Sequence, residues 1–232
     1  VGSMGNLSEF LMEELNVATA FTIPIFGGIE VAESTVISWV IMAIIVILTL
    51  VLTRNMRVEK PGKLQVGVEY AVTALQNLVR GIIGHEGERY VPYLSTVLVF
   101  LGISNIFAIF GMKPPTKDLN VTAALALMSI ILVQAASIRQ NKVGGWLKGF
   151  TKPSKVITPL NVMELAIRPL SLCMRLFGNV MGAFVVMKLL EHLVPVILPA
   201  VFSLYFDFFD GLLQAYVFVF LTGLYIKEAV EE

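Results

Sequence analysis

The sequence NVMELAIRPLSLCMRLFGNVMGAFVVMKLLE, residues 161–191, has the apolar content of a membrane helix but contains internal charges. Glu164, Arg168 and Arg175 lie among leucine, methionine and phenylalanine residues. Placing such a charge at the centre of a membrane helix costs about 2.5–3.5 kcal/mol on insertion scales. These side chains must therefore face something polar, which is either a carboxylate of the same chain or the polar surface of a partner.

One face of this predicted helix collects its polar residues and glycines, and we call it the polar stripe. At about 100° per residue its members fall within a sector of roughly 100°. They are Glu164, Arg168, Ser171, Arg175, Gly178, Asn179 and Gly182. Gly178 and Gly182 have the GxxxG spacing that lets two membrane helices approach closely. We therefore expect the polar stripe to present Arg175 to a partner; the alternative is that a carboxylate of this chain pairs with Arg175.

The composition is that of a polytopic membrane protein. Hydrophobic residues make up 56% of the 232 residues, which is too apolar for a soluble domain. The formal net charge is zero, so no general affinity for nucleic acid is expected. The single cysteine, Cys173, excludes an internal disulfide and a cysteine-cluster metal site, and we expect it to pack in the core. The sequence contains no phosphate-binding glycine loop, nucleophile constellation or metal-ligand cluster, so we expect no bond chemistry, cofactor or metal.

The chain before residue 158 is expected to form three membrane spans and one surface helix. The spans cover residues 35–53, 90–110 and 121–138, and each is long enough for a hydrocarbon core of about 30 Å. In residues 64–84 the apolar side chains recur on one side only, which predicts a helix that lies along the cytoplasmic face of the membrane or tucks under the bundle and does not cross. His85 follows it without a metal-binding companion and is expected to be a solvated loop residue.

The charge distribution orients these spans. Residues 5–33 are acidic and contain no lysine or arginine. The first span is followed by Arg54, Arg57, Lys60 and Lys63, and residues 139–155 contain five basic residues and no acidic one. The positive-inside rule places both basic segments in the cytoplasm, so residues 1–34 are expected outside, as a short surface helix and a turn at Pro24, Gly27 and Gly28. The first three residues, before Met4, are interpreted as a cloning remnant.

Two long apolar segments make up residues 158–232. As a helix, the stretch 161–191 would be roughly 46 Å long against a hydrocarbon core of about 30 Å, so it must tilt. Pro169 permits a bend. Pro195 and Pro199 are expected to turn the chain into a second long helix, about 200–230. The prediction is a strongly tilted antiparallel hairpin.

Polar residues also share one face of the last predicted helix. They are Ser203, Asp207, Asp210, Gly211, Gln214 and Tyr225. A line of carboxylate, amide and phenol groups along a membrane helix is typical of a hydrated proton or cation route. The alternative is that the two aspartates are counter-ions for Arg168 or Arg175. Similarly, Asp118 before the third span either caps the next helix or also belongs to the ion route.

Three segments resemble subunit a of F-type ATP synthases. Residues 168–179, RPLSLCMRLFGN, resemble the family's S-L-x-x-R-L-F-G-N, and residues 115–122, PTKDLNVT, resemble its P-T-x-D-L-N-x-T. Residues 214–218, QAYVF, with Leu221, Thr222 and Tyr225, resemble its last helix. They occur in the family's order and cover the chain from about residue 90 to the end. The fold expected is an all-α polytopic membrane protein with about five membrane-embedded helices, of which the last two form the long, strongly tilted hairpin, and an amphipathic interfacial helix.

The resemblance implies an ion-translocating stator subunit that forms two offset half-channels against a ring of small c subunits. Arg175 occupies the position of the family's essential arginine, which separates the half-channels, Asn179 that of its motif asparagine and Gln214 that of its last-helix glutamine. Asp207, seven residues before Gln214, falls where members carry an acid or a histidine. Phe184, five residues after Asn179, stands where some members carry a glutamate or histidine. The outer half-channel is therefore expected to depend on Asp207 or Asp210.

Glu164, Arg168 and Asp118 complete the expected ion-translocation residues, with Glu164 near the cytoplasmic route. The implied partners are the c ring, peripheral-stalk subunit b, other synthase subunits and membrane lipid. The implied location is a bacterial plasma membrane or an organellar membrane, with the C-terminus cytoplasmic. A secondary transporter is the competing class; it would favour broken helices or internal repeats, and no convincing repeat is present. A structural scaffold would tolerate the change Arg175→Gln.

Overall fold

The computed structural model describes residues 19–23, 29–54, 56–57, 62–85, 87–107, 114–149, 158–193 and 202–231. Within these residues the architecture is all-α, as predicted, apart from one short hairpin. Its strands, β1 (Thr19–Ile23) and β2 (Ile29–Ala32), pair antiparallel. The sequence pattern did not predict them, because such short strands offer few alternating positions. The surface helix and turn expected in residues 1–34 fall largely on 1–18 and 24–28, outside the described residues.

Six long helices and three short ones follow among the described residues. They are α2 (Glu33–Thr53), α3 (Lys63–Ile83), η1 (Glu88–Tyr90), α4 (Val91–Ile106), η3 (Pro115–Lys117), α5 (Leu119–Gly149), α6 (Thr158–Leu193), η5 (Leu204–Asp210) and α8 (Gly211–Glu231). Four described segments are long and apolar enough to cross a membrane: Glu33–Thr53, Leu119–Lys142, Thr158–Leu190 and Leu204–Val230. The expected span at 90–110 corresponds to α4, whose described part is 16 residues long.

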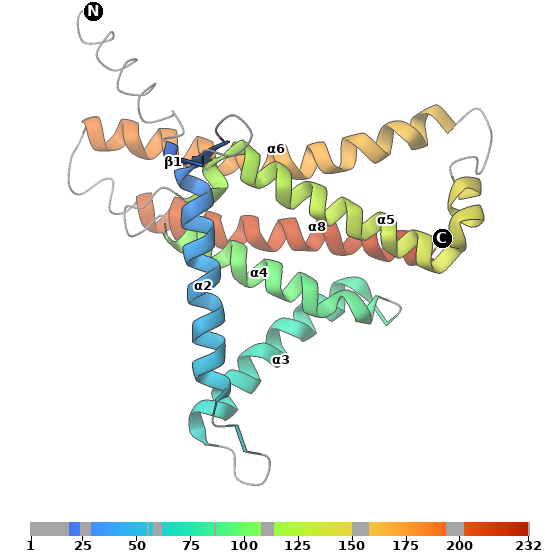
Figure 1. Ribbon diagram of the computed structural model, residues 1–232, viewed down its shortest axis with the longest axis horizontal. Coiled ribbons are helices and arrows are strands. Elements are labelled where there is room, and N and C mark those ends of the chain that lie inside the picture. Colours follow the sequence, from blue (N-terminus) through green and yellow to red (C-terminus); the bar gives the residue numbers. More distant parts are fainter. Residues whose placement is uncertain are drawn as a thin grey trace, which may run out of the picture.

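The last four long helices form one layered bundle. In Figure 1, α4, α5, α6 and α8 run side by side, and α2 runs across them near the end that carries β1. α6 and α8 run in opposite directions, which confirms the predicted hairpin. If α2 crosses the membrane steeply, the hairpin lies strongly inclined to the membrane normal. The turn expected at Pro195 and Pro199 lies outside the described residues.

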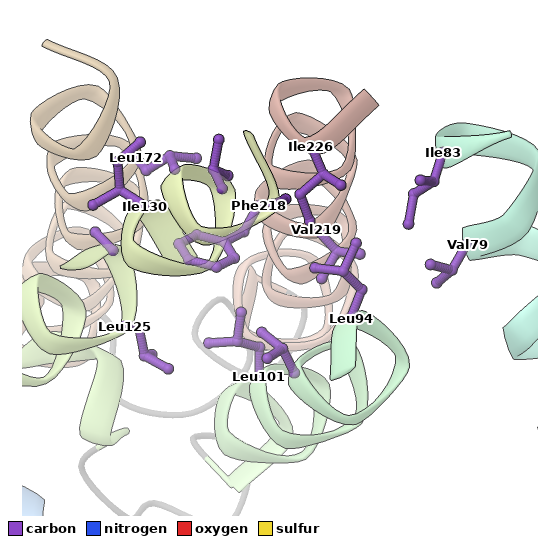
Figure 2. Packing of buried hydrophobic residues seen from close by; sticks show 14 of the residues in the cluster. Val79, Ile83, Leu94, Leu101, Leu125, Ile130, Leu172, Phe218, Val219 and Ile226 are labelled. Atoms are coloured by element: carbon purple, nitrogen blue, oxygen red, sulfur yellow. The ribbon is translucent and has the colours of Figure 1, made fainter. Parts of the chain in front are cut away.

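The core is built around α8. Figure 2 shows Phe218 directed toward α5, where Ile130 lies, and Val219 on the side of α3 and α4. α3 contributes only Val79 and Ile83 to the buried residues, whereas Leu64 and Tyr70 on the same helix are exposed. This one-sided docking agrees with the prediction of an interfacial helix. Cys173 is buried in the core cluster, and His85 is exposed in a bend after α3, both as predicted.

Two helices differ from the sequence prediction. α5 continues past the expected end at residue 138 and breaks at Lys142, whose φ is 56°. The segment beyond folds back so that the indole N–H of Trp146 donates to the side chain of Gln134, at 2.9 Å. Residues 139–149, expected as a loop, are therefore largely helical.

The last helix is not one continuous α-helix. Its first part, η5, is π-helical, with i→i+5 hydrogen bonds, and α8 begins at Gly211. A π-helical turn contains more residues than an α-helical turn, so it rotates the residues before Gly211 relative to those after it. The prediction that Asp207 and Asp210 share an α-helical sector with Gln214 is therefore wrong in its premise. Hydrophobic periodicity carries no signal for such a local change in winding.

Candidate functional site

α6 has a packed face and an open face. Leu172, Cys173 and Leu176 are buried in the core cluster shared with α5 and α8. Five members of the polar stripe, in contrast, are exposed: Glu164, Arg175, Gly178, Asn179 and Gly182. A Cβ atom placed on Gly178 or Gly182 would meet no atom of the described residues within 4 Å. The open face therefore combines a charge with exposed backbone at two glycines, which another helix can approach closely.

Arg175 has no partner within the described part of the chain. Its guanidinium makes no hydrogen bond and no ion pair with any described residue. The alternative of a counter-ion in the same chain thus finds no support among these residues, although the side chain of Asp207 lies outside them. A guanidinium stays charged under all ordinary conditions. Arg175 therefore has its full charge available for a group that approaches the open face.

Arg168, on the same stripe, is paired with two carboxylates and lies against an aromatic ring. Its Nη2 lies 2.8 Å from Oε1 of Glu228 on α8 and 3.2 Å from Oε2 of Glu164. The guanidinium carbon also lies 5.0 Å from the centroid of the Tyr225 ring. The carboxylates that pair with Arg168 are therefore glutamates and not the aspartates considered from the sequence. Sequence reasoning missed Glu228, although its position three residues after Tyr225 places it on the same side of a helix.

The polar faces of the two hairpin helices meet at a pair of amides. Nδ2 of Asn179 donates a hydrogen bond to Oε1 of Gln214 at 2.7 Å. Gln214 is buried, with 2% of its surface exposed, whereas Asn179 is exposed at the rim of the open face. Asn179 lies one helical turn after Arg175. The structure therefore brings the two predicted amides into contact beside the unpaired guanidinium.

The two aspartates of the last helix lie in the π-helical segment. Asp210 is half-buried, and its carboxylate makes no hydrogen bond or ion pair with any other described residue. It is therefore not a counter-ion for Arg168 or Arg175 in this structure. The backbone of Asp207 lies three residues earlier in the same π-helical segment, and its side chain is outside the described residues. Nowhere in the described chain do three or more His, Cys, Asp or Glu side chains form a group that could hold a metal ion.

Asp118 caps a helix, as one of its two predicted roles required. Its Oδ1 accepts the backbone N–H of Asn120 at 2.9 Å, at the start of α5. Its Oδ2 accepts a hydrogen bond from the hydroxyl of Ser34 on α2. Asp118 is 4% exposed. The carboxylate thus connects α2 to the bundle, and its additional role on an ion route stays a prediction.

Other polar contacts near this site were not predicted. Asn105 on α4 bonds both to Thr116 and to the backbone of Gly211. Nζ of Lys117 lies 3.6 Å from the centroid of the Phe184 ring, which is a cation–π contact. Phe184 thus contacts a cation at the position where some members of the resembled family carry a glutamate or histidine. Thr116 and Lys117 belong to the segment PTKDLNVT, so the motif marked the segment but not these contacts.

Comparison with known sequences identifies similar proteins along almost the whole chain. The sequence model for the family described as ATP synthase A chain matches residues 35–227. ATP synthase subunit a of Moorella thermoacetica is 37% identical over 205 residues, which cover 88% of this chain and 93% of that protein. ATP synthase subunit a 1 of Hahella chejuensis is 33% identical, over 89% of this chain and 87% of the relative. A subunit a from Propionigenium modestum that is named as sodium ion specific is 31% identical, over 88% of this chain and 75% of that protein.

Proposed function

The chain belongs to the ATP synthase A chain family, and from this premise we propose that it is the ion-translocating stator subunit of a rotary ATP synthase. It forms two half-channels against a ring of c subunits, each of which carries a membrane carboxylate. The observation that carries the proposal is the open face of α6, where the unpaired Arg175 stands beside Gly178 and Gly182. An ionised arginine in a membrane helix needs a counterpart, and the described part of this chain offers none.

Arg175 acts as an electrostatic barrier and as a release group. Two opposite unit charges 4 Å apart attract by about 4 kcal/mol at an effective dielectric constant of 20. For a proton carrier, that attraction lowers the pKa of the ring carboxylate by about three units. A loaded ring site that reaches Arg175 therefore gives up its ion. The fixed positive charge also opposes direct passage of a cation between the two half-channels.

The outer half-channel follows the start of the last helix. Asp207 or Asp210 receives the ion in the π-helical segment, and the amide pair of Asn179 and Gln214 lines the route toward Arg175. Support comes from the unpaired carboxylate of Asp210 and from the 2.7 Å contact between the amides. Carboxylates and amides in a membrane interior are the groups that replace a cation's water.

The cytoplasmic half-channel passes the other end of the hairpin. Glu164 is half exposed there, and Arg168 binds both Glu164 and Glu228. Arg168 keeps these acids close together and prevents them from trapping a cation. The chain spans a bacterial plasma membrane, with its N-terminus outside the cell and its C-terminus in the cytoplasm. Peripheral-stalk subunit b is a further partner. The relative from Propionigenium modestum is named as sodium ion specific, so sodium is tested beside the proton as the coupling ion.

Reconstitution tests the proposed function. The chain is tagged, purified with its associated subunits and incorporated into liposomes, and ATP-driven ion uptake is measured with and without sodium. We expect a ring of small hydrophobic subunits to copurify and uptake to require both the ring and ATP hydrolysis. Substrate uptake by this chain alone, without the ring, would instead identify an autonomous transporter.

A further inference from the structure

A buried polar junction joins α4, η3 and the start of α8. Nδ2 of Asn105 donates to the backbone carbonyl of Gly211 at 2.8 Å, and Oδ1 of Asn105 accepts the hydroxyl of Thr116 at 2.8 Å. Asn105 is 4% exposed and Thr116 is fully buried. A buried amide that satisfies both its oxygen and its nitrogen holds a single orientation. The junction therefore fixes the carbonyl of Gly211 relative to two other elements.

The junction depends on a very close approach of α8 to α4. A Cβ atom on Gly211 would lie 2.9 Å from Cβ of Asn105, a separation that would force the two helices apart. At Gly102, on the same side of α4, an added Cβ would lie 3.5 Å from Cδ2 of Leu212, which is ordinary van der Waals contact. The tight spot is therefore local to Asn105 and Gly211, and Gly102 provides a matched control position.

Gly211 is also the point at which the winding of the last helix changes. Its N–H donates to the carbonyls of Phe206 and Phe208 in the π-helical segment, while its own carbonyl accepts from Asn105. Both polar groups of Gly211 are thus held, one by the π-helical segment and one by α4. π-Helical turns are rare and occur mostly as single-turn bulges inside α-helices. If the contact from Asn105 were lost, the segment could rewind toward an α-helix, and Asp210 would turn to a different direction.

We propose that Asn105 is a positioning residue for ion uptake from the outer side: through Gly211 it holds the π-helical segment in the winding that presents Asp210 to the route. This inference rests on the proposed function. Asn105 does not bind the ion. The hydroxyl of Thr116 fixes the orientation of the Asn105 amide, so Thr116 acts on Gly211 through Asn105.

The test compares Asn105→Leu, Thr116→Val and the control Gly102→Ala in the complete complex in liposomes. ATP synthesis is driven by a constant potassium diffusion potential while the proton or sodium concentration on the outer-equivalent side is varied. We expect the half-saturating ion concentration to rise about three- to tenfold in Asn105→Leu, as for loss of one net hydrogen bond, with the maximal rate largely retained. Thr116→Val should shift it in the same direction by a smaller factor, and Gly102→Ala should not shift it.

Unchanged half-saturation in both Asn105→Leu and Thr116→Val would overturn the inference, as would an equal shift in Gly102→Ala. If Asn105→Leu fails to assemble, Thr116→Val, which removes only a hydroxyl, decides alone. The variant Arg175→Ala in the same assay separates this inference from the proposed function. Loss of coupling in Arg175→Ala together with normal Thr116→Val and Asn105→Leu complexes would reject the positioning role and leave the stator function intact.

Discussion

Two arginines on one helix have opposite environments, although they lie seven residues apart on the same stripe. Arg168 is held between Glu164 and Glu228, whereas Arg175 has no described partner. A paired arginine stabilises the hairpin, while an unpaired one is available to a moving charge. The function of each side chain therefore follows from what lies opposite it, which its residue type alone does not specify.

Replacing Arg175 by alanine should abolish ion-coupled ATP synthesis. The reason is that Arg168, the other arginine of the polar stripe, is already paired with Glu164 and Glu228, so among the described residues of the stripe only Arg175 is free to release the ring ion. Synthesis in liposomes is the measurement, and ATP hydrolysis by the detached soluble sector should persist. Near-normal coupled synthesis in this variant would reject the role of Arg175.

Breaking the bridge of Arg168 should have a much smaller effect. The bridge is partly exposed, so Arg168→Gln should lower stability by about 0.2–1 kcal/mol. Thermal unfolding of the detergent-purified complex measures this, and the double variant with Glu228→Gln should lose little more than either single variant. Complete loss of coupling in Arg168→Gln would mean that Arg168 acts on the ion directly.

Replacing the carboxylates of the two half-channels should also impair transport to different extents. Asp207→Asn should impair transport more than Glu164→Gln, because Glu164 already shares Arg168 with Glu228 and is half exposed. ATP-driven uptake in liposomes compares the two variants at equal protein content. Equal or reversed effects would remove Asp207 from the route.

At the scale of an element, α6 has one face packed against its own chain and one open face, to which the proposed function assigns a partner. Leu172 and Leu176 secure the packed face, and the glycine spacing of the open face leaves backbone exposed. Helix association in a membrane depends on such close contact, since lipid is as apolar as leucine. A large side chain on the open face should therefore affect assembly and spare the fold.

The change Gly182→Leu should reduce copurification of the c ring without lowering the thermal stability of this chain. No described atom lies within 4 Å of the position that its Cβ would occupy, so the chain itself has room. Gly67→Leu on α3 is the matched control, because that glycine also has no atom within 4 Å and lies away from α6. Equal ring recovery in both variants would show that the open face is not the ring contact.

At the scale of the whole molecule, Asp118 connects α2 to the bundle through Ser34 while it caps α5. Asp118→Ala should lower the free energy of unfolding by about 1–3 kcal/mol, because it removes a cap and leaves buried donors without an acceptor. Thermal unfolding measures this. Asp118→Asn preserves the shape and should retain most transport; loss of transport at normal stability would instead place Asp118 on the ion route.

Much of this molecule could be read from local patterns. Hydropathy located the helices, and the motif around Arg175 and the spacing of Gly178 and Gly182 defined the polar stripe. Those features are local, because a helix period assigns each residue to a face of its own helix. The same period assigned Asp207 and Asp210 to an α-helical face, whereas the structure winds η5 as a π-helix.

Which charges meet was decided by packing. Arg168 donates a hydrogen bond to Glu228, and Asn105 donates one to the carbonyl of Gly211, at sequence separations of 60 and 106 residues. Such pairings depend on the rotation and offset of one helix against another, which the many weak contacts of the core set together. The sequence by itself thus determined a charged stripe on a membrane helix. Only the tertiary structure decided that Arg168 is paired and that Arg175 has no described partner, because burial and pairing depend on which residues are neighbours in space.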